Sequence, residues 1–299
     1  MTIVVRKTHM THVEDAVQIL LRTGAVLAAQ AEAEALAAHA FGAPADTLPP
    51  DGEPDDASAA RFRELVARRS EGVPLGYLTG RAAFSGIDVE VGPGVFVPMI
   101  VSEATLAAGL TAVADIDAPL VVDLCAGSAA FALALAHHTP NATVHAVELD
   151  PDALDYARRN SARRTALGDP PVVLHQADVA QPTTLAALDG TVDLVLSSPP
   201  YIPDETGVPA EFGVHQPRQA VFSGPDGLSV TRHVVAAAAR LLRPGGTLVL
   251  EHGPLHAATV PALLRADGRF DEVSAHCDAY VGHPLYARAV RGRPGPATD

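Results

Sequence analysis

The sequence predicts an α/β protein in two parts: a small amino-terminal helical region, and a larger region built on a mostly parallel, doubly wound sheet. Three observations lead to this prediction. Apolar residues recur at helical spacing through residues 11–69. From Pro119 onward, short apolar and β-branched runs alternate with helical patterns, which is typical of a parallel sheet. A segment rich in Gly, aromatic and β-branched residues, 72–98, joins the two parts.

The amino-terminal region is expected to contain three helices. Thr11 and Glu14 fit a capping box, in which each side chain satisfies a free backbone N–H at the helix start. A second helix is expected from about Ala25 to Ala40, and a third from about Ala59 to Arg69. The segment 42–58 is rich in Pro, Gly and Asp and is expected to be a mobile loop.

The second part of the chain alternates strands and helices. Strands are expected at Leu120–Leu124, Thr143–Glu148, Val172–His175, Val192–Leu196, Thr247–Glu251, Phe270–His276 and Leu285–Val290. Helices are expected at Ala129–His137, after Asp150 with Pro151 in its first position, and at Ser229–Leu242. In such a sheet the carboxyl ends of the parallel strands are where the chemistry is placed.

Composition restricts the class of protein and partner. The chain has 299 residues, is 48% hydrophobic, and carries 21 Lys and Arg against 35 Asp and Glu, a net charge of −14. Because a duplex-binding surface usually carries a basic stripe, this balance argues against nucleic acid and is compatible with small or cationic substrates. Cys125 and Cys277 lack CxxC spacing, which argues against a disulfide framework. With neither a leader nor an apolar run of about 18 residues, we expect a soluble cytoplasmic protein.

The turn after the first sheet strand has the composition of a ligand site. Residues 121–130 read VVDLCAGSAA, a strand followed by small residues and a helix start. Small residues let a ligand approach the backbone, and the helix start offers free N–H groups. Only Gly127 of the three glycines in a dinucleotide fingerprint is present, which disfavours a pyrophosphate, and Asp123 suits a cation better. A tight turn without a ligand is the alternative.

Two further strand ends carry carboxylates. Glu148 follows Gly127 by 21 residues, and a carboxylate at about this spacing can accept both hydroxyls of a ribose. Asp178 follows the third strand, where it could accept an adenine amino group. A surface glutamate and a helix cap are the alternatives when each residue is considered by itself. Together with Asp123, they indicate a positively charged, adenosine-bearing cofactor, S-adenosylmethionine.

The stretch LVLSSPPYIP, residues 194–203, ends a strand in a stiff loop, because neither Pro199 nor Pro200 can donate to a sheet ladder. Methylation of a planar NH2 nitrogen needs acceptors for its protons, so that the delocalised lone pair turns toward the methyl group. A carbonyl near Pro199 and the Ser198 side chain can be those acceptors, and Tyr201 can cover the planar group. Such alignment contributes up to about 7–11 kcal/mol. A rigid turn without chemistry is the alternative.

Two other clusters are weaker candidates. Glu251, His252 and His256 suggest a metal site, but Pro254 breaks the helix that histidines at i and i+4 would need, and the HExxH order is absent. We therefore expect no metal. Cys125 lacks a paired base, so we expect a small packed residue rather than a nucleophile.

In these motifs the chain resembles the HemK/PrmC family, whose members methylate the side-chain amide of a glutamine in peptide-chain release factors. The matching segments are GVPLGYLTG (72–80), VGPGVFVP (91–98), DLCAGSAA (123–130), SPPYIP (198–203), PRQAVFSGPDGL (217–228) and LRPGGTLVLEHG (242–253). The resemblance implies a Rossmann-like class I methyltransferase with a seven-stranded sheet whose last strand is antiparallel. It also implies a small helical domain and a β-hairpin linker.

The resemblance implies three parts of the chain and a cofactor site. Residues 1–80 form a helical substrate-recognition domain, 81–104 the hairpin linker, with Ala82–Phe84 paired to Ile87–Val91, and 105–299 the S-adenosylmethionine-dependent methyltransferase domain. The residues expected to bind the cofactor are Phe96, Pro98, Asp123, Cys125, Ala126, Gly127, Glu148, Leu149, Asp178, Val179 and Ser198.

Several residues depart from the family pattern. Ser198 replaces the Asn of Asn-Pro-Pro-Tyr, and Met99–Glu103 reads MIVSE in place of Arg-Pro-Glu-Thr-Glu. The Arg replaced at position 99 removes a positive charge, while Glu103 and Glu211 lie in segments that could rim the pocket. A guanidinium has only hydrogen-bond donors and needs such acceptors. We therefore expect the acceptor to be the guanidino group of a small molecule such as free L-arginine, bound by Glu103, Tyr201 and Glu211.

Three other functions stay open from the sequence. One is the family's own reaction on a release factor glutamine. A second is a DNA amino-methyltransferase, because Ser-Pro-Pro-Tyr also resembles the loop of cytosine-amino DNA methyltransferases, although no basic face is evident. The third is a non-catalytic regulator that binds the cofactor without transferring its methyl group.

Overall fold

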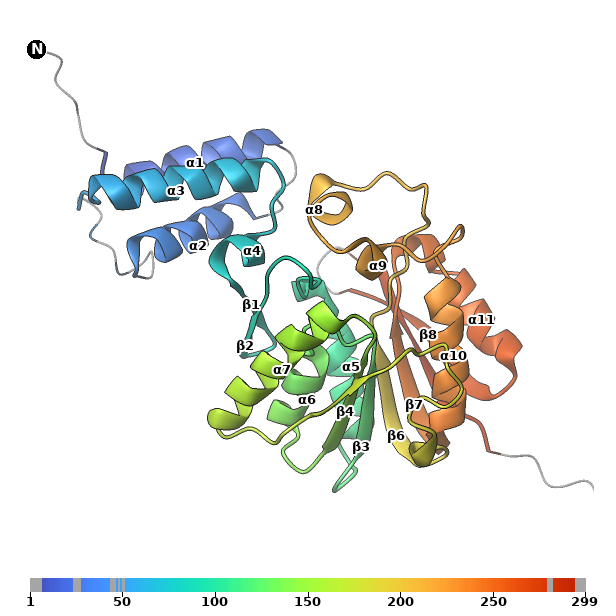
Figure 1. Ribbon diagram of the computed structural model, residues 1–299. Helices are drawn as coiled ribbons and strands as arrows, with labels where there is room; N and C mark the ends of the chain where they lie inside the picture. The colour runs from blue at the N-terminus through green and yellow to red at the C-terminus, as the bar shows by residue number, and fades with distance from the viewer. Residues whose placement is uncertain are drawn as a thin grey trace, which may run out of the picture. The chain divides into compact units, whose positions relative to one another are not determined.

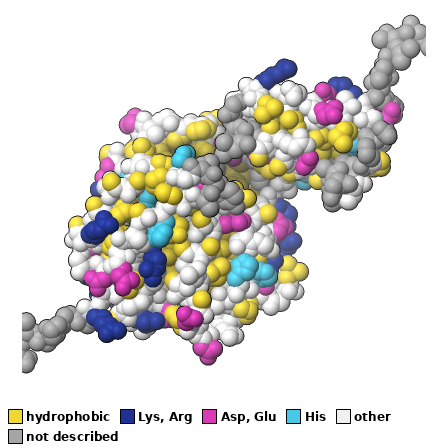
Figure 2. Space-filling model, turned by 180° about the vertical axis from the view of Figure 1, so that it is seen from behind, with side chains coloured by type: hydrophobic (Ala, Val, Ile, Leu, Met, Phe, Trp, Pro, Cys, Tyr) yellow, Lys and Arg dark blue, Asp and Glu magenta, His cyan; other side chains and the backbone are white. Residues whose placement is uncertain are grey.

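The computed structural model (Figure 1) describes residues 7–23, 28–43, 47, 49, 52–278 and 282–293. By its internal contacts the chain divides into two compact units. The first unit is Met1–Arg81 with Gly207–Gln216, and the second is Ala82–Thr206 with Pro217–Asp299. No helix in the described ranges is long and apolar enough to cross a membrane. On the face drawn in Figure 2, Lys and Arg side chains are scattered among Asp and Glu.

The first unit is helical. Its helices are α1 (His9–Thr23), α2 (Ala29–Phe41), α3 (Asp56–Ser70), α4 (Leu75–Thr79) and the short α8 (Ala210–Gly213). Apolar residues at helical spacing, including Leu20, Leu36 and Phe62, are almost fully buried between these helices. The rings of Phe41 and Phe62 lie 5.2 Å apart between centroids. Burial of this apolar surface, at about 25 cal/mol per Å², drives the packing of the unit.

Two helix starts differ from the sequence-based expectation. Helix α1 begins before Thr11, whose backbone N–H instead donates to Thr8 Oγ1 over 3.3 Å. Helix α3 begins at Asp56 because Asp55 caps it, accepting from the backbone N–H of Ser58 over 2.8 Å. The last residues of the expected loop 42–58 therefore form the cap and the first turn of α3. Residues 44–46, 48, 50 and 51 of that segment lie outside the described residues, as does the expected start of the second helix at Ala25.

The hairpin expected near residue 85 is present. Strands β1 (Arg81–Phe84) and β2 (Ile87–Glu90) form a two-stranded sheet. Ser85 and Gly86 join them with φ values of 46° and 80°. Two consecutive left-handed residues fit the two-residue turn whose twist matches that of paired strands.

The second unit holds a seven-stranded sheet in the order β5-β4-β3-β6-β7-β9-β8. The strands are β3 (Leu120–Leu124), β4 (Thr143–Glu148), β5 (Val173–Gln176), β6 (Val192–Ser197), β7 (Leu242–Glu251), β8 (Phe270–Cys277) and β9 (Pro284–Arg291). Strands β3 to β7 pair in parallel, and β9 is antiparallel to both β7 and β8. This is the Rossmann-like class I methyltransferase fold that the sequence predicts.

Helices cover both faces of this sheet (Figure 1). The helices are α5 (Glu103–Val113), α6 (Ala130–His138), α7 (Pro151–Ala166), α9 (Arg218–Val221), α10 (Ser229–Leu241) and α11 (Thr259–Asp267), with the 3-10 turns η2 (Ile100–Ser102), η3 (Ala186–Leu188) and η4 (Pro254–His256). Helices α5, α6 and α7 pack with one face of the sheet, and α10 and α11 with the other. The central strands β3 and β6 are apolar on both faces, as in other two-sided parallel sheets.

Strand β7 begins earlier than the expected Thr247. It starts at Leu242, directly after α10 ends, and its pairing with β6 shifts register between Val192 and Leu194. The Pro-Gly-Gly stretch, residues 244–246, therefore lies within the irregular first part of β7. Strand β3 lies between β4, the next strand in the chain, and β6, which comes later. In open α/β sheets, ligands bind beyond the carboxyl ends of the strands at such a switch point.

Candidate active site

The turn after β3 contains three residues in the left-handed region. Cys125, Gly127 and Ala129 have φ values of 65°, 55° and 64°. Only glycine adopts this conformation without a cost, which for other residues is roughly 1–2 kcal/mol. The turn is anchored by the N–H of Ala126, which donates to the carbonyl of Val147 over 3.0 Å. A Cβ built on Gly127 would meet no atom within 4 Å, so the backbone borders open space there.

Two carboxylates, the buried Asp123 and the half-buried Glu148, stand beside this turn. Asp123 is 1% exposed, and its Oδ2 accepts from the N–H of Ala132 over 3.2 Å, whereas Oδ1 has no hydrogen-bond partner in the structure. Glu148 Oε2 accepts from the N–H of Gly127 over 2.7 Å, and Oε1 from the N–H of Asp150 over 2.8 Å. The ends of β3 and β4 therefore present acceptors next to an open stretch of backbone.

The electrostatics of these carboxylates favour a cation. Burial, with the neighbouring Glu148 charge, raises the pKa of Asp123 to about 8. Burial also raises the pKa of Glu148. No ion pair among the described residues involves either side chain. A ligand with a sulfonium and an ammonium group would supply the missing positive charge, so these residues fit S-adenosylmethionine.

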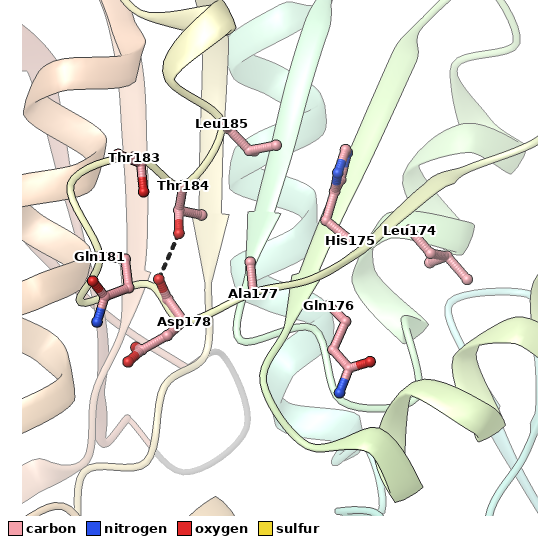
Figure 3. Close-up of a pocket in the computed structure, with 9 residues that line it drawn as sticks. All are labelled: Leu174, His175, Gln176, Ala177, Asp178, Gln181, Thr183, Thr184 and Leu185. Carbon is pink, nitrogen blue, oxygen red and sulfur yellow. Dashed lines mark hydrogen bonds between the residues drawn. The ribbon is translucent and has the colours of Figure 1, made fainter.

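The third carboxylate, Asp178, begins the loop after β5. Its Oδ1 accepts from the N–H of Ala180 over 2.8 Å, and its carbonyl accepts from Thr184 Oγ1 over 2.6 Å. Asp178 borders a shallow cleft of about 560 Å³ (Figure 3). The residues that line the cleft are Leu174, His175, Gln176, Ala177, Asp178, Gln181, Thr183, Thr184 and Leu185.

The other residues expected to bind the cofactor lie in several elements. Phe96 and Pro98 are half-buried in the irregular segment between β2 and η2. Leu149 directly follows β4 and is exposed, and Val179 packs against the core on the α10 side of the sheet. Cys125 also packs against that core, and burial raises the pKa of its thiol. A thiol kept protonated in this way is not a nucleophile.

The loop after β6 is tied to its neighbours on both sides. Ser197 is fully buried, and its Oγ donates to the carbonyl of Leu124 at the end of β3 over 2.7 Å. Ser198 Oγ donates to Glu251 Oε1, at the end of β7, over 3.0 Å. Pro199 is buried and Pro200 half-buried, so the chain leaves the sheet in a fixed direction.

Glu251 is a functional candidate that the sequence analysis considered only as a metal ligand. It is 3% exposed and accepts three hydroxyl hydrogen bonds, which together form a hydroxyl–carboxylate cluster. The members of this cluster are Glu251, Ser102, Thr105 and Ser198. The position of Glu251 at the end of the strand next to β6 is the sequence signal that could have identified it.

Tyr201 lies against two glycines. A Cβ built on Gly253 would approach Tyr201 Cε2 to 2.9 Å, and one built on Gly227 would approach the Tyr201 carbonyl oxygen to 2.5 Å. His256 Nε2 forms a hydrogen bond to the same carbonyl oxygen over 2.8 Å, so His256 supports the loop. Burial and the charge of Glu251 raise the pKa of the Tyr201 phenol, which excludes it as a base near neutral pH. The described residues hold no group of three metal-ligating side chains.

The two carboxylates expected to bind substrate already have partners. Glu103 Oε1 accepts from the backbone N–H of Ser85 over 2.6 Å. Glu211 belongs to the first unit, where its Oε2 pairs with Arg69 Nη2 over 3.0 Å, and Arg69 also pairs with Glu32. Glu103 and Tyr201 belong to the second unit. Their roles toward a substrate stay predictions.

Two family models match the chain. The PrmC N-terminal domain matches residues 13–80, and a methyltransferase domain matches residues 121–208. The release factor glutamine methyltransferase of Mycolicibacterium smegmatis is 42% identical over 281 residues, which cover 94% of this chain and 97% of that protein. The chain belongs to the HemK/PrmC family. Within that family it is an S-adenosylmethionine-dependent N-methyltransferase.

Not every relative is named for a release factor. A 4-amino-L-phenylalanine/4-methylamino-L-phenylalanine methyltransferase of Streptomyces pristinaespiralis is 40% identical over 263 residues, covering 83% of this chain and 84% of that protein. Among solved structures, a 16S rRNA N2-guanine methyltransferase from Thermus thermophilus with AdoMet and guanosine has a TM-score of 0.51. It is 21% identical and covers 71% of this chain and 50% of that one, which shows the fold alone.

The expectation of free L-arginine as the methyl acceptor is wrong. Relatives with 40–42% identity over most of the chain are named release factor glutamine methyltransferases, and these support a protein substrate rather than a small guanidino compound. In the structure, Glu103 accepts from the backbone N–H of Ser85 and Glu211 pairs with the guanidinium of Arg69.

Proposed function

We propose that the protein methylates the side-chain amide nitrogen of a glutamine in a peptide-chain release factor, and that it acts in the cytoplasm. The observation that carries the proposal is the loop Ser198–Tyr201, which follows β6 at the sheet edge where Asp123 and Glu148 also lie. Full-length similarity to a release factor glutamine methyltransferase supports the same substrate.

The cofactor is held, in this proposal, by three strand ends. Glu148 accepts the ribose hydroxyls with the lone pairs that its two backbone hydrogen bonds leave free. Asp123, with its unpaired Oδ1, faces the positively charged methionine part, and Asp178 accepts from the adenine amino group. The open backbone at Gly127 allows close approach. When bound, S-adenosylmethionine supplies an activated methyl group on a sulfonium.

The acceptor amide is held by the loop after β6. An amide nitrogen is a poor nucleophile because its lone pair is delocalised into the carbonyl. Ser198 Oγ and a carbonyl oxygen near Pro199 accept the two N–H bonds, which fixes the nitrogen and aligns its lone pair. Tyr201 covers the planar amide. Because Pro199 and Pro200 restrict the backbone, these acceptors are held in place before the substrate binds.

A second candidate acceptor is the aromatic amino group of an amino acid. The observation that favours it is the hydrogen bond from Ser198 to Glu251, which occupies the only hydrogen of the hydroxyl. An amide carbonyl needs a donor, whereas an aromatic NH2 needs only acceptors, and Ser198 in this state offers only acceptors. A relative named for 4-amino-L-phenylalanine supports the same class of acceptor.

One experiment decides between the two acceptors. The purified full-length protein is incubated with methyl-labelled S-adenosylmethionine and either a release factor of the same organism or 4-amino-L-phenylalanine. We expect label in the release factor, on a glutamine, and none when that glutamine is changed to alanine. Label in 4-amino-L-phenylalanine alone would make the second candidate the function, and label in neither would contradict both. The Glu148→Ala variant, which should bind the cofactor poorly, is the negative control.

A further inference from the structure

The hydroxyl–carboxylate cluster places a carboxylate behind the acceptor loop without a counter-charge. Glu251 Oε1 accepts from Ser102 Oγ and Ser198 Oγ, each over 3.0 Å, and Oε2 accepts from Thr105 Oγ1 over 2.9 Å. No ion pair among the described residues includes Glu251. A buried carboxylate that is held only by neutral donors keeps the ability to take up a proton, whereas an ion pair would suppress it.

The groups that face Glu251 come from four elements. Ser102 and Thr105 lie on η2 and α5, Ser198 follows β6, and Tyr201 lies in the loop beyond it. Tyr286 of β9 stands opposite Glu251 in the sheet register. Burial raises the pKa of Glu251, and the three hydroxyl donors oppose this rise. The carboxyl of Glu251 therefore holds a proton more readily than an exposed glutamate does.

The direction of the Ser198 hydrogen bond has a chemical consequence. With its hydrogen on Glu251, Ser198 Oγ can only accept from an N–H of the substrate. As the new bond to carbon forms, the substrate nitrogen carries one proton too many. A hydroxyl that accepts from that nitrogen and donates to a carboxylate is a two-bond path along which this proton can leave.

We propose that Glu251 is the positioning residue and proton acceptor of the methyl transfer and acts through Ser198. The inference rests on the proposed transfer to an NH2 group, but not on which acceptor carries it. When the methyl carbon–sulfur bond breaks and the carbon–nitrogen bond forms, one N–H bond of the acceptor breaks and leaves its electron pair on nitrogen. That proton bonds to Ser198 Oγ, and the original Ser198 hydrogen moves to Glu251 Oε1. The products are the methylated acceptor, S-adenosylhomocysteine and a neutral Glu251, which then releases its proton to water.

The hydroxyl–carboxylate cluster contains one residue, Ser198, that departs from the family pattern. Ser198 stands where the family pattern has Asn, whereas Ser102 stands where that pattern has Thr, which also carries a hydroxyl. Both serines donate to the same oxygen of Glu251. An Asn side chain carries its own donor and acceptor, whereas a serine needs a partner that fixes its hydrogen.

The first test needs no acceptor. The carboxyl carbons of glutamate are labelled in the full-length protein with bound S-adenosylmethionine and titrated by NMR, with Glu251→Gln used to assign the signal. We expect Ser198→Ala to raise the pKa of Glu251, because a donor to the ionised form is lost. An unchanged pKa would show that Ser198 does not donate to Glu251 and would overturn the proposal. This result is independent of whether the release factor proves to be the substrate.

The second test is the pH profile of turnover with the acceptor that the enzyme methylates. Turnover should fall as the pH falls through the raised pKa of Glu251, since a protonated Glu251 cannot accept. Glu251→Gln should remove this acidic limb and lower kcat roughly 100-fold, with the affinity for S-adenosylmethionine unchanged. Glu90→Gln makes the same chemical change at a half-exposed hairpin residue that pairs with Arg159, and it should keep the wild-type profile. An acidic limb and a kcat that survive in Glu251→Gln would overturn the proposal.

A third variant tests the proposal even if Glu251→Gln fails to fold. Thr105→Val removes the donor to the other carboxylate oxygen and leaves Ser198 untouched. It should raise the pKa of Glu251 and move the acidic limb to higher pH. A purely packing role for Glu251 would leave the limb where it is, and that result would overturn the proposal.

Discussion

The carboxylate of Glu148 accepts a hydrogen bond from the backbone N–H of Gly127 over 2.7 Å and so joins the end of β4 to the turn after β3. The two residues lie 21 positions apart in the chain. One side chain therefore shapes the turn after β3. In our proposal, the cofactor approaches the backbone at this turn and Glu148 also binds its ribose.

Replacing Glu148 should affect binding more than folding. In Glu148→Ala, the turn loses its acceptor and the ribose loses its partner, so we expect the dissociation constant for S-adenosylmethionine to rise at least about 10-fold. Isothermal titration measures this. Asp155→Ala, an exposed change on the helix that follows β4, is the control and should bind as the wild type does. Equal affinity in Glu148→Ala would refute the ribose assignment.

The raised pKa of Asp123 predicts how stability depends on pH. Its folded-state pKa of about 8 lies above the ordinary value of 3.8 for an aspartate, so the folded state binds more protons than the unfolded state between these values. Stability without cofactor should therefore fall as the pH rises through this window, by up to roughly 1.4 kcal/mol per pH unit for this group. In Asp123→Asn the contribution is absent. The gain in melting temperature of Asp123→Asn over the wild type should be larger at about pH 8 than at about pH 5. A gain that does not vary with pH would contradict the assignment.

Two substitutions of Tyr201 separate packing from proton transfer. In our proposal the ring of Tyr201 covers the acceptor, so Tyr201→Ala should lower turnover while S-adenosylmethionine binds as before. Tyr201→Phe keeps the ring, and because the raised pKa keeps the phenol neutral, its turnover should stay within a few-fold of the wild type. Turnover and cofactor affinity are measured for both. A loss in Tyr201→Phe as large as in Tyr201→Ala would assign the phenol a direct role.

The contact between Gly227 and the Tyr201 carbonyl should make residue 227 intolerant of a side chain. Gly227→Ala would bring a Cβ to 2.5 Å from that oxygen, at a φ of 74°. Gly268→Ala has nearly the same φ, 75°, but meets no atom within 4 Å, so it measures the backbone cost alone. Urea unfolding should show Gly227→Ala to be less stable than Gly268→Ala by about 1–3 kcal/mol, with lower turnover. Equal stability of the two variants would mean that the loop containing Tyr201 can move away from the new side chain without a cost in free energy.

Local patterns in the sequence were enough to predict the parallel strands. The apolar runs of β3, β4 and β6 start and end within one residue of the expected positions, because buried strands need continuous apolar residues. The irregular start of β7 was missed, since a Pro-Gly-Gly stretch predicts a helix stop but not that the following residues pair with a strand. The assignment of residues 207–216 to the helical unit depends on long-range contacts such as Arg69 with Glu211, which no local pattern encodes.

In the candidate site, too, local patterns predict single residues but not the contacts between residues that are far apart in the chain. The place of Glu148 at the end of a strand could be predicted from the local sequence pattern alone. The hydroxyl–carboxylate cluster could not, because Ser102 and Ser198 lie 149 and 53 positions from Glu251 in the chain. The sheet order puts β7 next to β6 and so brings Ser198 to Glu251, whereas the packing of α5 on β7 brings Ser102 there. The expectation of arginine is corrected by the relatives rather than by the site, and the partners of Glu103 and Glu211 are visible only in the fold.

The most direct test of the account is the mass of a release factor of the same organism after incubation with the full-length protein and S-adenosylmethionine. The account predicts an increase by one methyl group, which peptide mapping assigns to the side chain of a single glutamine, with S-adenosylhomocysteine formed in equal amount. A release factor of unchanged mass, while the same enzyme methylates 4-amino-L-phenylalanine, would contradict the protein substrate.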